Sequence, residues 1–521
     1  MGAEGARRKP KLSGQRTELS AVQLAYLYLS LLSLSISLEQ ISCRDLLFFL
    51  SRKTGTLKSR AGSVNLLKEF VMEFVVSFVD AVNNVLWGWL LLFLLCGTGI
   101  YYTFRLRFIQ VRKFRYAFKR LLGNASLHGE SADKTGMSSF QALTTAIAAQ
   151  VGTGNIAGAA TAIAAGGPGA IFWMWLSAFF GMATNYSEAV LALKYKETNE
   201  AGETVGGPAY YIRAAFKGAF GKALAVFFCV AIILACGFMG NMVQSNSIGS
   251  ACEAAFGLNS VHVGIFVAVL GGFIFIGGTQ RIARVTEKLV PIMAVLYVLG
   301  CLVVICANIT AVPEAFKTIF VMAFSPESAG GGALGITIQK AMRFGVARGL
   351  FSNEAGMGST PHAHALAKVK HPDDQGVMAM IAVFIDTFVV LTCTALVIVV
   401  TGTWTSGVTG TALAQAAFGT VFGSFGNTFI AICLFFFAFS TIISWYFFGE
   451  VNVKALLGTK FVKFYAIIAL GFIVLGSSLK VDLVWNISDM FNGLMVLPNL
   501  LALLALSGVV VAIAKSKESE K

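Results

Sequence analysis

The sequence QVGTGNIAG, at residues 150–158, lies in the middle of an apolar segment and interrupts it with three glycines and three polar side chains. Inside a lipid bilayer every backbone N–H and C=O group must be paired within the protein, so a broken helix is tolerated only where it is buried or lines a cavity. The break therefore predicts a binding site inside a membrane protein.

A second apolar segment, five crossings later, is interrupted in the same way. It reads MRFGVARG at residues 342–349 and leads into SNEAGMGS at residues 352–359. Breaks at corresponding positions of two five-helix halves are typical of inverted-repeat transporters, whose site lies at the bilayer midplane. The alternative is that the glycines only allow helices to pack closely. Close packing alone explains a single glycine cluster better than it explains two clusters at matching positions.

The composition places the chain in the membrane class. Of 521 residues, 56% are hydrophobic and only 13% are charged, which is far from the globular average. The formal net charge of +14 does not predict a nucleic-acid partner, because the basic residues lie in loops between apolar segments and not on one face. The expected surrounding partner is the lipid bilayer. The nine cysteines show no metal or disulfide spacing and are interpreted as packing residues.

The chain divides into three parts. Residues 72–514 form the predicted membrane domain, and residues 515–521 form a cytoplasmic tail. Residues 1–71 differ in character from the rest, and three interpretations are open: an extra helix at residues 21–38, a targeting segment, or an extension translated from an early start codon, with the natural start at Met72. We favour the third interpretation.

The hydropathy pattern predicts a leading helix at residues 85–103 and ten further crossings, giving about eleven transmembrane helices. The ten crossings lie near residues 138–165, 169–195, 222–250, 261–278, 284–308, 333–365, 375–401, 427–450, 462–478 and 488–514. The loop after the leading helix carries seven basic residues and no acid, which marks it as cytoplasmic. The later loops alternate accordingly, so the C-terminus is also predicted to be cytoplasmic.

A broken helix has a direct use in binding. One half-helix ends in unpaired N–H groups and the other in unpaired carbonyls, so one end suits an anion and the other a cation. A zwitterionic amino acid fits both ends. Its carboxylate would meet the N–H groups of Thr153 and Gly154, and its ammonium would meet carbonyls near Gln150 and Phe344.

The stretch GGPGAIFWMWLSAFFG at residues 166–181 resembles the signature of the alanine or glycine:cation symporter family. Residues 152–158 and 349–358 are also similar to that family, and the resemblance extends from Met72 to the C-terminus. It implies an all-α polytopic protein with a leucine-transporter (LeuT) type five-plus-five inverted repeat and one extra leading helix. It also implies import of alanine or glycine coupled to Na⁺ across a cell membrane, the bacterial cytoplasmic membrane being expected. Proton-coupled uptake of the same amino acids is the alternative.

The resemblance and the break together imply a substrate site. Its residues are Gln150, Gly152, Thr153, Gly154, Asn155, Met242, Gln244, Phe344 and Gly345. Gln244 is a polar residue in an apolar helix, which usually faces the protein interior; a plain helix–helix hydrogen bond is its alternative. Met242 would narrow the pocket.

The resemblance also implies a Na⁺ site between two helices. Its ligands would be the carbonyls of Ala148 and Val151 and the hydroxyls of Ser440 and Thr441, since a hard cation prefers oxygen. The alternative for each hydroxyl is a hydrogen bond to its own helix.

Charged residues near the second break need a separate interpretation. Arg343 and Arg348 are expected to pair locally with Glu354 in a gate or a structural ion pair. His362 and His364 either carry protons or lie at the membrane interface.

The remaining function classes are disfavoured. The sequence has no HExxH, GxSxG or Walker motif, so no enzyme activity and no cofactor other than the co-transported Na⁺ is predicted. It also has no repeated filter segment of the kind that builds a channel. The sequence carries no assignment of oligomeric state.

Overall fold

The computed structural model describes residues 60–122, 136–199, 202–324, 338–479 and 481–519. The chain separates into two units, residues 1–75 and residues 76–521, and helix α3 (Arg60–Val85) contains the boundary between them. All the candidate site residues belong to the second unit, which is the one described below. The predicted helix at residues 21–38 lies outside the described residues.

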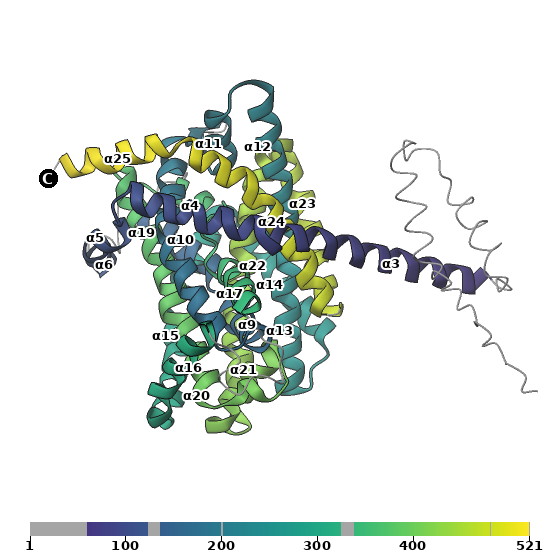
Figure 1. The fold of residues 1–521 in the computed structure, drawn as a ribbon. Helices are drawn as coiled ribbons and strands as arrows, with labels where there is room; N and C mark the ends of the chain where they lie inside the picture. Colours follow the sequence, from purple (N-terminus) through teal and green to yellow (C-terminus); the bar gives the residue numbers. More distant parts are fainter. Residues whose placement is uncertain (1–59, 123–135, 200–201, 325–337, 480, 520–521) are drawn as a thin grey trace, which may run out of the picture. The chain divides into compact units, whose positions relative to one another are not determined.

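The second unit is helical almost throughout (Figure 1). After α3 come η2 (Leu86–Leu90), α4 (Leu91–Arg105), α5 (Ile109–Arg112) and α6 (Phe114–Leu122). The first half of the core contains α8 (Ser139–Gln150), η3 (Gly154–Gly158), α9 (Ala159–Gly166), α10 (Gly169–Lys194), β1 (Glu197–Thr198), β2 (Thr204–Val205), α11 (Pro208–Ala215), α12 (Gly218–Ile232), η4 (Ile233–Gly240), α13 (Asn241–Phe256), α14 (Ser260–Phe275) and α15 (Gly278–Ala307).

The second half follows the same plan. It contains η5 (Ile309–Ala311), α16 (Val312–Phe324), α17 (Ile338–Asn353), α18 (Pro361–Ala365), α19 (Pro372–Val383), η8 (Phe384–Leu391), α20 (Thr392–Val400), η9 (Thr403–Thr405), α21 (Gly410–Phe422), α22 (Phe425–Leu457), η10 (Thr459–Phe461), α23 (Val462–Ser478), α24 (Val481–Ala505) and α25 (Ser507–Ser519). The short strands β1 and β2 pair antiparallel, with Glu197 opposite Val205.

Seven helical segments of the described residues are long and apolar enough to cross a membrane. The two interrupted elements are not among them, because each is divided into pieces of 16 residues or fewer, shorter than a bilayer crossing requires. The total of about eleven crossings therefore stays a prediction. The last crossing differs from its predicted bounds, since α24 ends at Ala505 and a separate helix, α25, continues to Ser519.

The first interrupted element breaks where the sequence predicts. Helix α8 ends at Gln150, Val151 leaves the helical region at φ −80° and ψ 87°, and the chain resumes helical turns at Gly154. Ser138 begins this helix with a capping box, because its side chain accepts from the Gln141 N–H while the Gln141 side chain accepts from the Ser138 N–H.

The second interrupted element breaks later than predicted. Helix α17 continues without interruption through residues 342–349 and ends at Asn353. The irregular segment is residues 354–360, where Glu354, Gly356 and Gly358 have φ values of 55°, 91° and 81°. Glycine adopts this left-handed region without the steric cost that other residues carry. The glycine that suggested the earlier break, Gly345, serves close packing instead.

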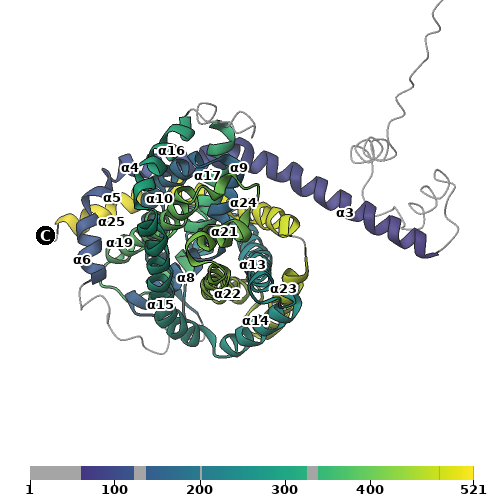
Figure 2. The same cartoon turned by 90° about the horizontal axis from the view of Figure 1, so that it is seen from below.

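The two broken elements lie beside each other in the interior. Helix α17 packs against α9 and η3, and both views place α17 next to α9 (Figures 1 and 2). Viewed from below in Figure 2, α22 is surrounded by α8, α13 and α15, and it packs against all three. The first break is therefore contacted by two different elements, since α22 packs against α8 on one side of it and α17 packs against η3 and α9 on the other.

Candidate functional site

Two side chains, one within the break and one from α13, accept hydrogen bonds from the N–H groups of the first break. The Gly152 N–H donates to Asn155 Oδ1 at 2.9 Å, and the Thr153 N–H donates to Gln244 Oε1 at 3.1 Å. These are the N–H groups that a helix start leaves without an intrahelical partner. The sequence-predicted residues Thr153, Asn155 and Gln244 are therefore brought together, and Gln244 reaches the break from α13.

Gln150 connects the two breaks. Its Nε2 donates to the Asn353 carbonyl at 2.7 Å, across 203 residues of sequence. Gln150 Oε1 and Thr153 Oγ1 are buried, and neither has a hydrogen-bond partner among the described residues. Buried polar atoms are nearly always paired. Gln150 Oε1 can therefore accept a hydrogen bond from a bound polar molecule, and the Thr153 hydroxyl can donate or accept one.

An acidic residue that the sequence analysis did not select lies beside the first break. Asp386, on η8, is fully buried and accepts from Asn155 Nδ2 at 2.6 Å, from Ser352 Oγ at 3.0 Å and from Thr387 Oγ1 at 2.8 Å. No lysine or arginine forms an ion pair with Asp386 within the described residues. A lone buried carboxylate is costly unless it binds a cation or a proton. The signal was present in the sequence, because an acid lies within the apolar crossing at residues 375–401.

Three of the four predicted Na⁺ ligands, Ala148, Ser440 and Thr441, lie close together. Thr441 Oγ1 lies 2.9 Å from the Ala148 carbonyl and 3.3 Å from the Ala149 carbonyl, and Ser440 Oγ lies 3.4 Å from the Ala148 carbonyl. Val151 follows in the same break and is fully buried. The alternative also occurs, since both hydroxyls donate to the carbonyl of Phe437 on their own helix. The group offers neutral oxygens, which suits a hard alkali cation.

Glycine is required where the break approaches α22. A Cβ atom added to Gly152 would lie 2.4 Å from Thr441 Oγ1 and 3.2 Å from Gln244 Oε1. A Cβ atom on Gly154 would lie 3.0 Å from the Ser352 Cα. Any larger residue at either position would displace its neighbours. Without side chains at Gly152 and Gly154, the backbone of the break can contact a ligand directly.

Two predicted substrate residues, Phe344 and Gly345, lie away from the second break. Phe344 is half-buried on the continuous part of α17, and a Cβ atom on Gly345 would lie 2.4 Å from the Ala170 carbonyl on α10. At 1.5 Å per residue, Phe344 lies roughly 12 Å along the helix from Ser352. Met242 packs against Gly476 of α23. The placement of Phe344 and Gly345 at the second break was therefore wrong, and Ser352 and Asn353 hold that place.

The expected local ion pair between the arginines and Glu354 was also wrong. Arg348 forms a two-pronged pair with Asp489 on α24, at 2.8 Å for each nitrogen, and Arg343 donates to Asn84 Oδ1 at 3.3 Å. Glu354 instead accepts from Trp445 Nε1 at 2.5 Å and from the Ser359 hydroxyl. The arginines project from the helical part of α17, whereas Glu354 begins the irregular segment, so their side chains point to different neighbours.

Glu188 of α10 holds the second break. Its carboxylate accepts from the N–H groups of Gly356 at 3.0 Å and Gly358 at 2.9 Å, and from Asn499 Nδ2 at 2.6 Å. The left-handed glycines therefore direct two N–H groups toward one acidic side chain. This residue was missed because its sequence neighbourhood, within a long regular helix, does not reveal which break it faces.

The two histidines are buried in the protein. His362 contacts Asn452 Nδ2 at 2.8 Å and the Ser359 carbonyl at 2.7 Å, and His364 contacts Gln375 Nε2 at 3.0 Å. A pocket of about 200 Å³ opens beside His362, between the segment around β2, the α14–α15 turn and α22. No residue of the first break lines it, so it is distinct from the substrate site identified above.

Comparison with known proteins gives consistent matches. The family model of the sodium:alanine symporters matches residues 72–521. The sodium/alanine symporter AgcS of Methanococcus maripaludis is 44% identical over 450 residues, which cover 85% of this chain and 97% of that protein. The probable sodium/glutamine symporter GlnT of Bacillus subtilis is 42% identical over 453 residues, covering 87% of this chain and 92% of that protein.

A solved structure shows the fold. The crystal structure of MhsT in complex with L-phenylalanine superposes with a TM-score of 0.51 at 13% identity, and the match covers 73% of this chain and 98% of that chain. This likeness confirms the predicted LeuT-type architecture.

Proposed function

Because this chain belongs to the sodium:alanine symporter family, we propose that it imports alanine, and glycine as its smaller analogue, together with Na⁺. The family membership makes the chain an integral membrane protein and a Na⁺-coupled amino-acid symporter, and not an enzyme. The proposal concerns the cargo, the residues that bind it and the ion site. We further propose that the membrane is the cytoplasmic membrane of a bacterium, with the C-terminus inside the cell.

The observation that carries the proposal is the polar surface of the first break. The N–H groups of Thr153 and Gly154 would hold the carboxylate of the amino acid, and the unpaired Gln150 Oε1 would accept from its ammonium. In this structure the Thr153 N–H donates to Gln244 Oε1. A bound carboxylate would replace Gln244 Oε1 as the acceptor of this N–H group or would share the N–H group with it. Gln244 would therefore take a direct part in binding the cargo.

The same site favours a small side chain. Gly152 and Gly154 are in such close contact with Thr441 and Ser352 that neither position has room for a Cβ atom. Contacts this tight leave little free volume beside the break, which favours a hydrogen or a methyl side chain on the cargo over a long one. Alanine and glycine are therefore favoured over glutamine, the substrate that the name of the Bacillus subtilis relative GlnT gives for that protein.

The Na⁺ ion would lie between α22 and the carbonyl end of α8. The hydroxyls of Ser440 and Thr441 and the carbonyls of Ala148 and Val151 would supply neutral oxygen ligands there. The ion would also face the carbonyl end of the half-helix, whose partial negative charge attracts a cation. Binding it would fix α22 against the break.

Proton coupling is the second candidate, and one observation favours it. Asp386 is a buried acid without a basic partner among the described residues, and it hydrogen-bonds Asn155 in the first break. A carboxyl group in that setting can exchange one proton during each transport cycle. The Bacillus subtilis relative YrbD, 39% identical, carries the name of a putative sodium/proton-dependent alanine carrier.

The two coupling mechanisms are separated by transport measurements in sealed proteoliposomes. Radiolabelled alanine uptake is measured with a Na⁺ gradient alone and with a pH gradient alone. Accumulation above equilibrium with Na⁺ alone supports the proposal, and accumulation with the pH gradient alone replaces it with proton coupling. Unlabelled glycine should compete with alanine, while glutamine and leucine should compete weakly. Strong competition by leucine would contradict a small pocket.

A further inference from the structure

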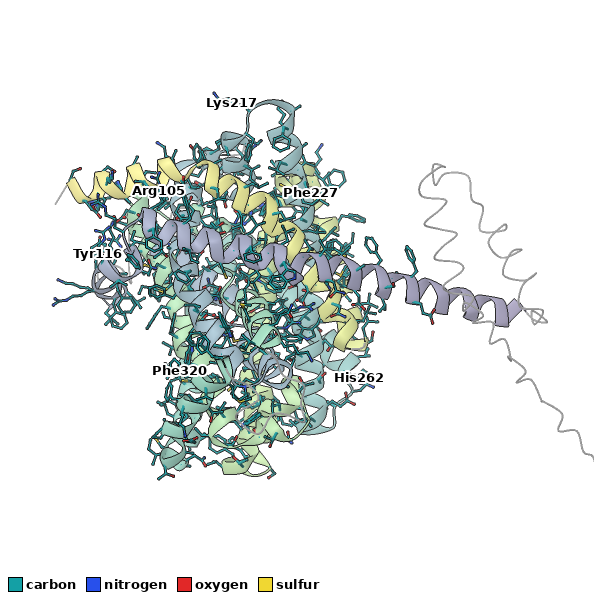
Figure 3. All side chains as sticks on the ribbon, viewed as in Figure 1. Arg105, Tyr116, Lys217, Phe227, His262 and Phe320 are labelled. Carbon is teal, nitrogen blue, oxygen red and sulfur yellow. The ribbon has the colours of Figure 1, made fainter. Side chains whose placement is uncertain are left out.

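The turn that follows the leading helix forms a basic groove with the C-terminal helix. The groove lies between the end of α4, the turn into α5, and α25. Its rim carries four basic side chains and one acidic side chain: Arg105, Arg107, Arg112, Lys515 and Glu518. Figure 3 labels Arg105 beside α25, and Figures 1 and 2 both place α25 next to α4. None of these residues belongs to the transport site.

One of the four basic residues is already engaged. Arg112 donates through Nε to the Arg107 carbonyl at 2.8 Å and through a terminal nitrogen to the Leu106 carbonyl at 3.1 Å, and it pairs with Glu518 at 3.1 Å. It therefore holds the carbonyls of the turn that follows α4 and fixes the shape of the groove. Arg105, Arg107 and Lys515 have no carboxylate partner among the described residues. Three cations of the groove are thus available to an anion.

The backbone at this turn is strained. Arg107 and Phe108 have φ values of 53° and 55°, the left-handed region that residues other than glycine seldom adopt. Two such residues in succession persist only where the surroundings hold them, and they occur frequently at ligand-binding positions. The turn points Arg107 into the groove, while Phe108 stays exposed beside Phe104, with ring centroids 5.3 Å apart.

The exposed aromatic pair and the basic groove lie at the end of a membrane-crossing helix. The candidate span Glu73–Arg105 ends at the groove, and the basic loop marks this end as the cytoplasmic side. Phe104 and Phe108 are 64% and 41% exposed, as expected where acyl chains cover them. Basic pockets between helices at this depth bind the headgroups of anionic lipids.

We propose that this groove binds the phosphodiester headgroup of an anionic phospholipid. Arg105, Arg107 and Lys515 hold the phosphate, and Phe104 and Phe108 contact the acyl chains. Glu518 lies in the same groove and competes with the lipid through its negative charge. The site ties the leading helix to the C-terminal helix, so the bound lipid fixes one end of the membrane domain. The inference goes beyond the proposed transport function and does not depend on the identity of the cargo.

The test uses the full chain in detergent, with short-chain phosphatidylglycerol as the probe and native mass spectrometry as the readout of bound lipid. The double variant Arg105→Ala/Arg107→Ala should weaken the tightest lipid association about thirtyfold, since each basic side chain at an anionic surface contributes roughly 1 kcal/mol. The matched control, Lys217→Ala/Lys222→Ala, removes two exposed charges at the start of α12, outside the groove, and should leave the affinity unchanged (Figure 3).

A second variant has the opposite expected sign. Glu518→Gln removes the competing carboxylate and should tighten lipid binding severalfold, a change that misfolding does not produce. Phosphatidylcholine should bind no more tightly to the wild-type chain than to the double arginine variant. Equal losses in the arginine and lysine variants would overturn the proposal, because binding would then follow net charge alone. Displacement of the lipid by glycerol phosphate at the same concentration would also overturn it, because a free phosphate site would need no acyl-chain contacts.

Discussion

The hydroxyl of Thr441 gives the sharpest test of the ion site. It lies 2.9 Å from the Ala148 carbonyl and 3.1 Å from the Phe437 carbonyl, so the geometry allows both an ion ligand and a bond within the helix. Thr441→Val replaces the hydroxyl by a methyl group of similar size and keeps the rest of the side chain. If the hydroxyl only bonds to the helix, its loss costs about 1 kcal/mol of stability and leaves ion binding unchanged.

A lost ion ligand has a larger and different effect. Interactions with a charged partner contribute about 1.5–3 kcal/mol, so the half-saturating Na⁺ concentration should rise roughly tenfold to a hundredfold. Binding of the two cargoes is reciprocal in free energy, so alanine affinity should fall at low Na⁺ and recover as Na⁺ is raised. Water has little access to this buried position and cannot replace the oxygen.

The assay is alanine uptake into proteoliposomes across a Na⁺ titration, with choline as the replacement cation. Thr441→Ser is the matched control, because it keeps the oxygen and removes only a methyl group, at a cost of about 0.8 kcal/mol in packing. The serine variant should therefore keep the wild-type Na⁺ dependence. A valine variant with lowered stability but an unchanged half-saturating Na⁺ concentration would refute the ion site at Thr441.

Three further changes have expected outcomes. Asp386→Asn keeps the shape that Ser352 and Asn155 contact but removes the charge, so uptake per molecule should fall at least tenfold; full activity would assign Asp386 a packing role. Gly154→Ala places a Cβ atom 3.0 Å from the Ser352 backbone and should lower alanine affinity about tenfold by isothermal calorimetry, whereas Gly97→Ala, which meets nothing within 4 Å, should not. Deletion of residues 1–71 should leave membrane insertion and uptake unchanged, since the family match begins at residue 72; loss of insertion would show that the segment at residues 21–38 is needed.

The first break could be located from the sequence because its glycines and polar residues interrupt an apolar helix at one place. Gln244 could be associated with it because a polar side chain in an apolar helix usually faces the interior. The structure brings Gln244 to the Thr153 N–H at 3.1 Å. Local composition was sufficient to select both residues, since each is a polar interruption of its own apolar helix.

The second break could not be located in the same way. Gly345, Gly356 and Gly358 look alike in the sequence, yet the first allows close packing against α10 and the other two adopt left-handed backbone. What distinguishes them is Glu188, which accepts from the N–H groups of Gly356 and Gly358 and lies 168 residues from the first of them. A tertiary partner at that separation leaves no signal in the local pattern. The expected pairing of Arg348 failed for the same reason, because its partner is Asp489 on another helix.

Buried acidic side chains account for how a chain with so many glycines holds two interruptions in a defined shape. A break exposes N–H groups that lipid cannot satisfy, and an acidic residue from another helix holds each break, either directly or through an amide side chain. Glu188 binds the second break directly, and Asp386 binds the first through Asn155, whose Oδ1 accepts from the Gly152 N–H. The first connection runs through an amide that can rotate, whereas the second is direct. A cation or proton that neutralises Asp386 therefore changes its bonds to Asn155 of the first break, where the cargo is proposed to bind, and to Ser352 of α17. The hydrogen bonds from Gly356 and Gly358 to Glu188 do not involve Asp386.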